Sequence, residues 1–227
     1  MRTLAVFPLQ EELAFFLAHG KDRGLRWRES RLGRLPVYRS ADLNLTLARG
    51  GIGKAQFAVQ TQHLLDADPS WQMVICAGAA GALVDDLTIG DVVVATTTLE
   101  HDYRNRFSQR PLPAFAGARP ALDALRLVRP ADQAYAIHFG PVASGDEDIV
   151  DDDRRWQLRD QTGGLVAAWE GAGGARACAF AGIPFVEIRG VTDAADAIAP
   201  SAFEINLERA MANIADLITT WLERTQA

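Results

Sequence analysis

The sequence contains little of what disulfide-stabilised, membrane-spanning or nucleic-acid-binding proteins need. Its 227 residues include two cysteines, Cys76 and Cys178, both in apolar stretches where a buried, reduced thiol without a functional role is the common case. No uncharged run approaches the length of a membrane span, and Pro8 and Glu11 interrupt the short apolar start, which is unlike a signal peptide. Lys and Arg number 23 against 29 Asp and Glu, so the net charge is -6. We therefore expect a cytoplasmic protein that binds neither nucleic acid nor membranes.

Metal and nucleotide motifs are also missing. The acidic stretch SGDEDIVDDDRR (144–155) lacks the spacing of a calcium loop, and we interpret its acids as helix caps and solvated side chains. GGIGK (50–54) lacks the ending of a Walker loop, and neither it nor AGAAGAL (77–83) is a dinucleotide fingerprint. The four histidines form no zinc-like cluster. We expect no metal and no cofactor.

What the sequence does contain is an alternation of strand-like runs with amphipathic or Ala-rich runs. This order predicts an α/β domain with a largely parallel central sheet. Residues 203–224 should form a closing helix, packed through apolar residues at helical spacing from Ile205 to Leu222. The Pro-rich residues 110–122 are interpreted as an inserted loop, either a lid or a subunit contact. The four predicted strand and helix pairs are 3–7 with 10–20, 45–50 with 53–65, 73–78 with 79–83, and 183–191 with the closing helix.

Three acids follow strand-like runs, at the positions where ligands bind parallel sheets. Glu12 comes shortly after residues 3–7, Glu170 follows LVAAW, and Asp193 follows EIRGVT. We expect the three to converge on one sheet edge. Each also has a structural explanation: Glu12 could favour a helix dipole, and Asp193 could be a helix N-cap. Glu170, between Trp169 and small residues, should be partly buried and needs a partner.

Taken together, these segments resemble the nucleoside phosphorylase/nucleosidase family, in particular its nucleosidases for 5'-methylthioadenosine and S-adenosylhomocysteine. The resemblance implies a single three-layer α/β/α domain over residues 1–227, with a mixed, largely parallel sheet. It also implies a homodimer or larger homo-oligomer whose neighbouring subunit reaches the active site. The segments that carry the resemblance keep their order along the chain: FPLQEEL, GIGKA, AGAAGALVDDLTIGDVVV, the HD pair at 101–102, VASGDEDIV and AWEGAGGARACAFAGIPFVEIRGVTDAAD.

The resemblance implies roles for the three acids. Glu170 falls on the family's glutamate that binds the ribose hydroxyls, with Trp169 in place of a methionine. Asp193 falls on the aspartate that protonates N7 of the purine, and Glu12 on the glutamate that activates water. Cleavage of an N-ribosidic bond needs such an acid, such a base and polar anchors on the sugar, so the chemistry agrees with these roles.

The resemblance leaves water and phosphate as possible nucleophiles. The family's phosphorylases carry a Gly-Asp-Pro-x-Arg type segment whose arginine holds phosphate, whereas this chain has FPLQEEL there, with two acids. Carboxylates would repel phosphate. We therefore expect a hydrolase that releases free base from a 5'-modified adenosine. A phosphate-dependent phosphorylase, or a catalytically weak nucleoside-binding protein, remains the alternative.

The chain departs from the family pattern around the base and sugar. Asp148 stands where the family has an aromatic residue that stacks on adenine, Trp169 replaces methionine, and Ala79 replaces serine. Asp148 could hydrogen-bond a base edge, and Phe139 or Tyr103 could supply the stacking face. The predicted base pocket comprises Ala79, Gly81, Ser144, Asp148 and Ile149, and further candidates for substrate contact are Ile52, His101 and Arg189.

Overall fold

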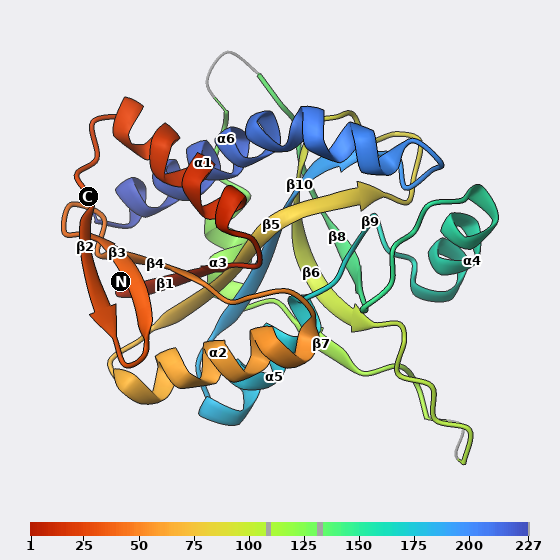
Figure 1. Cartoon of the computed structure of the whole chain (residues 1–227), viewed down its shortest axis with the longest axis horizontal. Helices are drawn as coiled ribbons and strands as arrows, with labels where there is room; N and C mark the ends of the chain where they lie inside the picture. The colour runs from red at the N-terminus through yellow and green to blue at the C-terminus, as the bar shows by residue number, and fades with distance from the viewer. Residues whose placement is uncertain (108–109, 131–133, 227) are drawn as a thin grey trace.

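The strand-like runs of the sequence pair in one mixed sheet with helices on both faces (Figure 1). The computed structural model describes residues 1–107, 110–130 and 134–226. The strands are β1 (Thr3–Phe7), β2 (Arg28–Leu32), β3 (Leu35–Ser40), β4 (Leu45–Arg49), β5 (Met73–Ala82), β6 (Val92–Glu100), β7 (Ala114–Ala116), β8 (Ile137–Ser144), β9 (Val166–Ala168) and β10 (Phe185–Asp193). The helices are α1 (Gln10–Asp22), α2 (Lys54–Ala67), α3 (Arg119–Leu125), α4 (Asp152–Thr162), α5 (Gly171–Ala181) and α6 (Ala199–Gln226).

The centre of the sheet is parallel, as the sequence predicts. β4, β1, β5 and β10 lie side by side in parallel, and β3 and β2 extend the sheet antiparallel beyond β4. Every residue of β1 and of β10 is buried, which fits the apolar sequence of β1, whereas β10 also carries four buried polar or charged side chains. The carboxyl ends of β1, β5 and β10 therefore meet at one edge of the sheet.

The other part of the sheet closes on itself. β10 pairs with both β5 and β6, and β6 pairs with β8, β8 with β9, and β9 with β5. The core of this closed part is built mainly from small side chains such as Ala80, Ala95 and Val142. Such residues fit a narrow interior, as in other small barrels.

Two helical layers complete the predicted three-layer fold (Figure 1). One hydrophobic cluster joins α1, α3 and α6 to one face of the sheet, and a second joins α2 and α5 to the opposite face. The closing helix is confirmed as α6, but Ile205 is 79% exposed and faces away from the core. Within the described residues, no helix combines the length and apolar character needed to cross a membrane.

Two predicted elements are wrong. Residues 79–83 were expected to be helical, but β5 continues through Ala82 because pairing with β10 and β9 outweighs the weak strand propensity of Ala and Gly. Residues 110–122 are not simply a loop, since they contain β7 and the start of α3, which has Pro120 in its first turn, where proline is compatible with a helix. The acidic stretch behaves as predicted, because the Asp151 side chain accepts a hydrogen bond from the Arg154 amide at the start of α4.

Candidate active site

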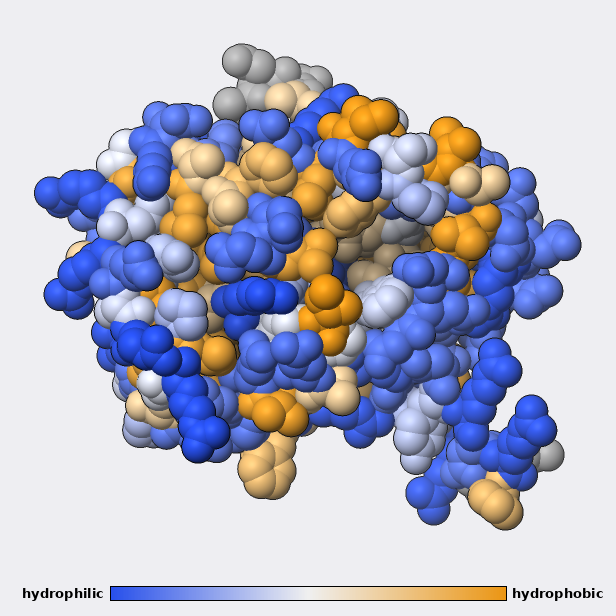
Figure 2. Space-filling model, viewed as in Figure 1, coloured by the Kyte–Doolittle hydropathy of each residue, from blue (hydrophilic) through white to orange (hydrophobic). Residues whose placement is uncertain are grey.

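One cavity of about 500 Å³ opens beside the carboxyl ends of β5 and β10, a volume that suits a small organic ligand. Figure 2 shows a hollow in the face of the molecule, with apolar and polar side chains around it. The walls come from the turn before α1, the end of β5, the loop after β8, the β9–α5 junction, the end of β10 and the start of α6. They include all three predicted acids, Glu12, Glu170 and Asp193.

Glu12 lies in the first turn of α1, where it is held by backbone amides from two segments. Its Oε2 accepts from the Leu9 amide at 2.9 Å and its Oε1 accepts from the Ala79 amide at 2.8 Å. The carboxyl group is 2% exposed, and this burial raises its pKa to about 7 although both amides lower it. Glu12 is thus both a helix-start residue and a cavity residue able to exchange a proton near neutral pH.

Asp193 ends β10 and is held from both sides. Its Oδ2 accepts from Thr192 Oγ1 at 2.7 Å, and its Oδ1 accepts from the Ala195 amide at 2.9 Å. Burial raises the pKa of this carboxyl despite these bonds. The alternative of a helix N-cap does not hold, because α6 begins only at Ala199.

Glu170 has the partner that its burial requires. Its Oε1 accepts from the Gly53 amide at 3.0 Å, and its Oε2 lies 3.9 Å from Arg189 Nη2. Burial raises the pKa of Glu170, while Arg189 and the Gly53 amide lower it. The glycine-rich segment 50–54 therefore meets the β9–α5 junction directly. Trp169 also lines the cavity.

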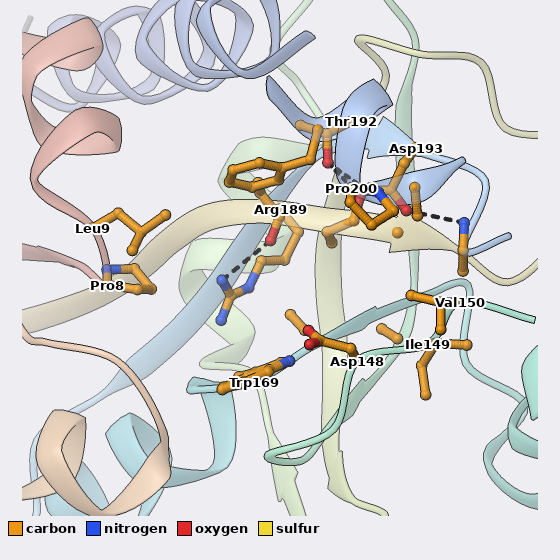
Figure 3. A pocket seen from close by; sticks show the side chains of 18 of the residues that line it. Pro8, Leu9, Asp148, Ile149, Val150, Trp169, Arg189, Thr192, Asp193 and Pro200 are labelled. Carbon is orange, nitrogen blue, oxygen red and sulfur yellow. Dashed lines mark hydrogen bonds between the residues drawn. The ribbon is translucent and has the colours of Figure 1, made fainter. Parts of the chain in front are cut away.

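Arg189 lies at the cavity floor and is 1% exposed. Its Nε donates to Glu187 Oε1 at 2.7 Å, and its Nη1 donates weakly to the Ala79 carbonyl at 3.4 Å. Figure 3 shows it between two groups of lining residues, with Pro8 and Leu9 on one side and Asp193 and Pro200 on the other. The predicted neighbourhood of Arg189 and the acids is therefore present.

The other predicted pocket residues divide into two groups. Ile52, Ala79, Gly81, Asp148 and Ile149 line the cavity. Ser144 does not: it lies behind Trp169, donating to the Trp169 carbonyl at 2.6 Å and accepting from the Ala172 amide at 2.8 Å. Its role in this structure is to hold the β9–α5 junction.

His101 and the two proposed stacking residues lie outside the cavity lining. His101 is buried against Gly145, with Nδ1 3.7 Å from Glu147 Oε2, and burial lowers its pKa. Phe139 lies under the Arg126 guanidinium at 4.8 Å, and Tyr103 faces Arg176 at 5.9 Å. Phe139 and Tyr103 thus pack beside arginines and not in the cavity.

Sequence reasoning missed several apolar cavity residues. Pro8 and Leu9 belong to the segment FPLQEEL, in which only Glu12 was predicted to be a site residue. Phe203 belongs to the first turns of α6, ahead of the apolar residues from Ile205 to Leu222 that predict core packing. Among the described residues, no group of three or more His, Cys, Asp or Glu side chains could hold a metal ion.

Comparisons with known proteins agree with this architecture. The 5'-methylthioadenosine/S-adenosylhomocysteine nucleosidase of Bacillus pumilus is 31% identical over 199 residues, covering 82% of this chain and 83% of that protein. The aminodeoxyfutalosine nucleosidase of Helicobacter pylori is 30% identical over 179 residues, 76% of each chain. The crystal structure of the 5'-methylthioadenosine/S-adenosylhomocysteine nucleosidase from Neisseria meningitidis in complex with methylthio-immucillin-A is 27% identical, with a TM-score of 0.85 over 99% of this chain and 100% of that one. A family model described as the phosphorylase superfamily matches residues 3–223, and the chain therefore belongs to that superfamily.

Proposed function

We propose that this protein is a purine nucleosidase that hydrolyses the N-ribosidic bond of a 5'-modified adenosine and releases the free base. The observation that carries the proposal is the convergence of Glu12, Glu170 and Asp193 on one cavity, each from a different element and each with its own backbone partners. The nucleosidase relatives support the same reaction class.

In this proposal Asp193 is the acid at the leaving base. Breaking the bond to the sugar places negative charge on the purine, so a proton delivered to N7 stabilises the departing base. Burial raises the pKa of Asp193, which favours a proton on its carboxyl group when a substrate closes the cavity. The Thr192 and Ala195 bonds fix its direction.

Glu12 is the proposed base for water. As the sugar develops positive charge, water adds to C1' and loses a proton to the Glu12 carboxylate. A pKa of about 7 suits this transfer, because near neutral pH a substantial fraction of the group is ionised while the carboxylate is still basic enough to take the proton. Its two amide bonds keep the carboxylate at a fixed position.

Glu170 is the proposed anchor of the ribose. One of its oxygens is held by the Gly53 amide, and its carboxylate can accept from the adjacent 2' and 3' hydroxyls. Apolar residues that line the cavity can pack against a 5' substituent that carries no charge. Pro8 and Leu9 lie on the side of Arg189 away from Asp193 in Figure 3, and Ile52 and Phe203 also line the cavity.

Water is favoured over phosphate as the nucleophile by the charge of the cavity. Among the described lining residues, the acids are Glu12, Glu147, Asp148, Glu170, Asp193 and Glu204, and Arg189 is the only Lys or Arg. Arg189 already donates to Glu187. An incoming phosphate would face more carboxylates than cations.

We also propose that the protein is cytoplasmic and acts as a homodimer or larger homo-oligomer. Two free, buried cysteines suit a reducing compartment. Exposed apolar side chains support self-association, and Ile52, at 49% exposed, lies at the cavity itself.

The test is chromatographic detection of free base from 5'-methylthioadenosine, S-adenosylhomocysteine, 5'-deoxyadenosine, adenosine, inosine and futalosine, each with and without phosphate. Release in phosphate-free buffer that Asp193→Asn abolishes is the expected result. Release only with phosphate would indicate a phosphorylase. Binding of a nucleoside without release of base would favour the binding-protein alternative.

A further inference from the structure

A buried carboxylate that the proposed chemistry does not use lies directly beneath the cavity. Glu187 is on β10, two residues before Arg189, so both side chains project from the same face of the strand. Its side chain is fully buried, and it does not line the cavity. A carboxylate in such a place is costly unless it is paired, so its partners show what it does.

The partners of Glu187 come from three elements. Its Oε1 accepts from Arg189 Nε at 2.7 Å, and its Oε2 accepts from Thr98 Oγ1 on β6. Gly171, the first residue of α5, leaves the space that the carboxylate needs, because a Cβ there would lie 2.2 Å from both carboxylate oxygens. The carboxylate thus lies against the first turn of α5, where the helix dipole favours an anion.

Arg189 faces two further carboxylates on its cavity side. Glu170 Oε2 lies 3.9 Å from Nη2, and an ideal Cβ on Gly78 would lie 2.7 Å from Glu12 Oε1 and 2.9 Å from Arg189 Nη1. On β5, Cys76 Sγ lies 3.4 Å from Nη2, and burial raises the pKa of this thiol well above its usual value, so it carries no charge. The charged groups around the guanidinium are therefore Glu12 from α1, Glu170 from the start of α5, and Glu187 from β10.

We propose that Glu187 is a positioning residue that immobilises Arg189 and balances its charge, so that the cavity floor offers no free cation to phosphate and water remains the nucleophile. The inference deepens the proposed hydrolytic function and rests on it. Glu187 makes the short, charge-assisted bond to Arg189, whereas Glu170 is more distant. The arginine is consequently held as a fixed hydrogen-bond donor beside Glu12 and Glu170.

Removing the charge of Glu187 should leave the positive charge of Arg189 without its nearest counter-ion. In Glu187→Gln the side chain keeps its size and can still accept from Nε, but the guanidinium is then balanced only by groups of the cavity. Phosphate should bind at the floor and compete with the nucleoside. Glu12 should ionise more easily, because a less compensated cation now lies near it, so the acidic limb of the kcat/KM profile should move to lower pH.

The experiment compares the wild-type chain, Glu187→Gln, Glu187→Asp and Thr98→Val. Thr98→Val is the matched control, because it removes a bond to the same carboxylate without changing charge. Inorganic phosphate binding is measured by calorimetry without nucleoside, and the pH dependence of kcat/KM is measured on the best substrate. We expect Glu187→Gln to bind phosphate roughly tenfold more tightly than wild type and to shift the acidic limb by roughly one pH unit. Glu187→Asp and Thr98→Val should do neither.

Phosphate binding and the pH profile of hydrolysis together distinguish a failure of this inference from a failure of the proposed function. If no nucleoside is hydrolysed, the proposed function fails, while phosphate binding still tests the charge balance. Unchanged phosphate affinity and an unchanged pH profile in a folded Glu187→Gln would overturn the inference. Should that variant not fold, the wild type decides: phosphate at millimolar concentration should neither inhibit hydrolysis nor raise its Tm, and inhibition competitive with the nucleoside would overturn the inference.

Discussion

The carboxyl group of Asp193 occupies the space in which Gly81 would otherwise carry a side chain. An ideal Cβ on Gly81 would lie 2.6 Å from Asp193 Oδ1. The two residues are paired between β5 and β10, just after an irregularity in the register at Val191–Asp193. Glycine at this position therefore lets the acid of the proposed reaction lie beside the strand.

Gly81→Ala should displace Asp193 and reduce hydrolysis. The methyl group should push the carboxyl out of its bonds to Thr192 and Ala195, because Asp193 Oδ1 and Ala195 Cβ are the atoms nearest to it. We expect kcat to fall roughly a hundredfold, since small displacements of a catalytic group have such effects. Overpacking should cost about 1–3 kcal/mol of unfolding free energy. Steady-state kinetics and denaturant unfolding measure the two effects.

A double variant tests whether Gly81→Ala acts through Asp193. Once Asp193→Asn has removed the acid, Gly81→Ala should have little further effect on kcat. If the losses of activity of the two single variants multiply in the double variant, Gly81 affects the cavity independently of Asp193.

Glu12 should set the acidic limb of the pH profile. Burial raises its pKa to about 7, and a base acts only when it is deprotonated, so kcat/KM should fall as pH decreases below about 7. Glu12→Gln should remove the limb together with most of the activity, because an amide neither accepts the proton nor satisfies both the Leu9 and Ala79 amides. Glu11→Gln changes the exposed neighbour and is the control. If the acidic limb persists in Glu12→Gln, another group is responsible for it.

Glu170 should discriminate ribose from deoxyribose. Its carboxylate is the proposed acceptor for the 2' and 3' hydroxyls, and a hydrogen bond to a charged group contributes about 1.5–3 kcal/mol. Glu170→Ala should lower kcat/KM for a ribonucleoside roughly a hundredfold or more, with a roughly tenfold smaller loss for the 2'-deoxy analogue, which keeps only the 3' hydroxyl bond. The same assay on both substrates gives the ratio directly. An equal loss on both would mean that Glu170 acts through Gly53 or Arg189, and not on the sugar.

The meeting of Glu12 and Asp193 was predictable because it depends on parallel strands. Glu12 and Asp193 follow β1 and β10, which are parallel to β5, and the carboxyl ends of parallel strands share an edge. Glu170 follows β9, which is antiparallel to β5, so its place in the cavity depends on the closure of the sheet and not on this rule. The loop-like expectation for residues 110–122 failed because Pro120 suits the first turn of a helix as well as a loop.

Glu187 and Phe203 could not be found in this way. An acid between two apolar residues of β10 could equally project to solvent, and the burial of Glu187 depends on Thr98 and Gly171, which are distant in sequence, as well as on Arg189. Phe203 fits an amphipathic helix, and only the path of the chain between Asp193 and α6 directs it toward the cavity. In both cases the surroundings of the side chain depend on tertiary contacts that the local sequence does not specify.

Lys54 should stabilise the loops on either side of the cavity. Its Nζ donates to Glu100 Oε1 at 2.9 Å and to Asp102, and its amide donates to Asp146 Oδ1 at 2.8 Å. Burial alone would lower the pKa of Lys54, but the bonds to Asp102 and Glu100 raise it overall. Lys54→Met should reduce the unfolding free energy by about 1–3 kcal/mol, between the values for exposed and for buried ion pairs.

The pH dependence of this loss follows from Asp102. Burial would raise its pKa, yet the bonds from Lys54 and the Asp146 amide lower it overall, so its contribution is present above its usual value of 3.8 and is lost as pH falls through the lower folded value. The difference between wild type and Lys54→Met should therefore shrink below about pH 4. Arg119→Met, which removes an exposed pair with Asp123, should change stability little at any pH. A comparable loss in both variants would contradict the role of Lys54.

Asp148 should select a base that carries an amino group. Its neighbours on the loop after β8 are engaged elsewhere: Asp146 accepts from the Lys54 amide, and Glu147 accepts from Arg154 at 2.7 Å. The Asp148 carboxylate instead lines the cavity beside Trp169, across from Asp193 in Figure 3. A carboxylate accepts from the 6-amino group of adenine and repels the 6-oxo group of hypoxanthine. We expect wild type to prefer 5'-methylthioadenosine over 5'-methylthioinosine by roughly tenfold or more in kcat/KM.

Asp148→Asn should bring that ratio close to one, because an amide can both donate and accept and so suits either base edge. Asp148→Phe separates selection from stacking: an aromatic ring can lie on both bases, so it should lower KM for each without restoring the preference. An unchanged ratio in Asp148→Asn would mean that the carboxylate remains in solvent when the nucleoside binds. Selectivity would then come from backbone groups beside Ile149, which side-chain substitution leaves in place.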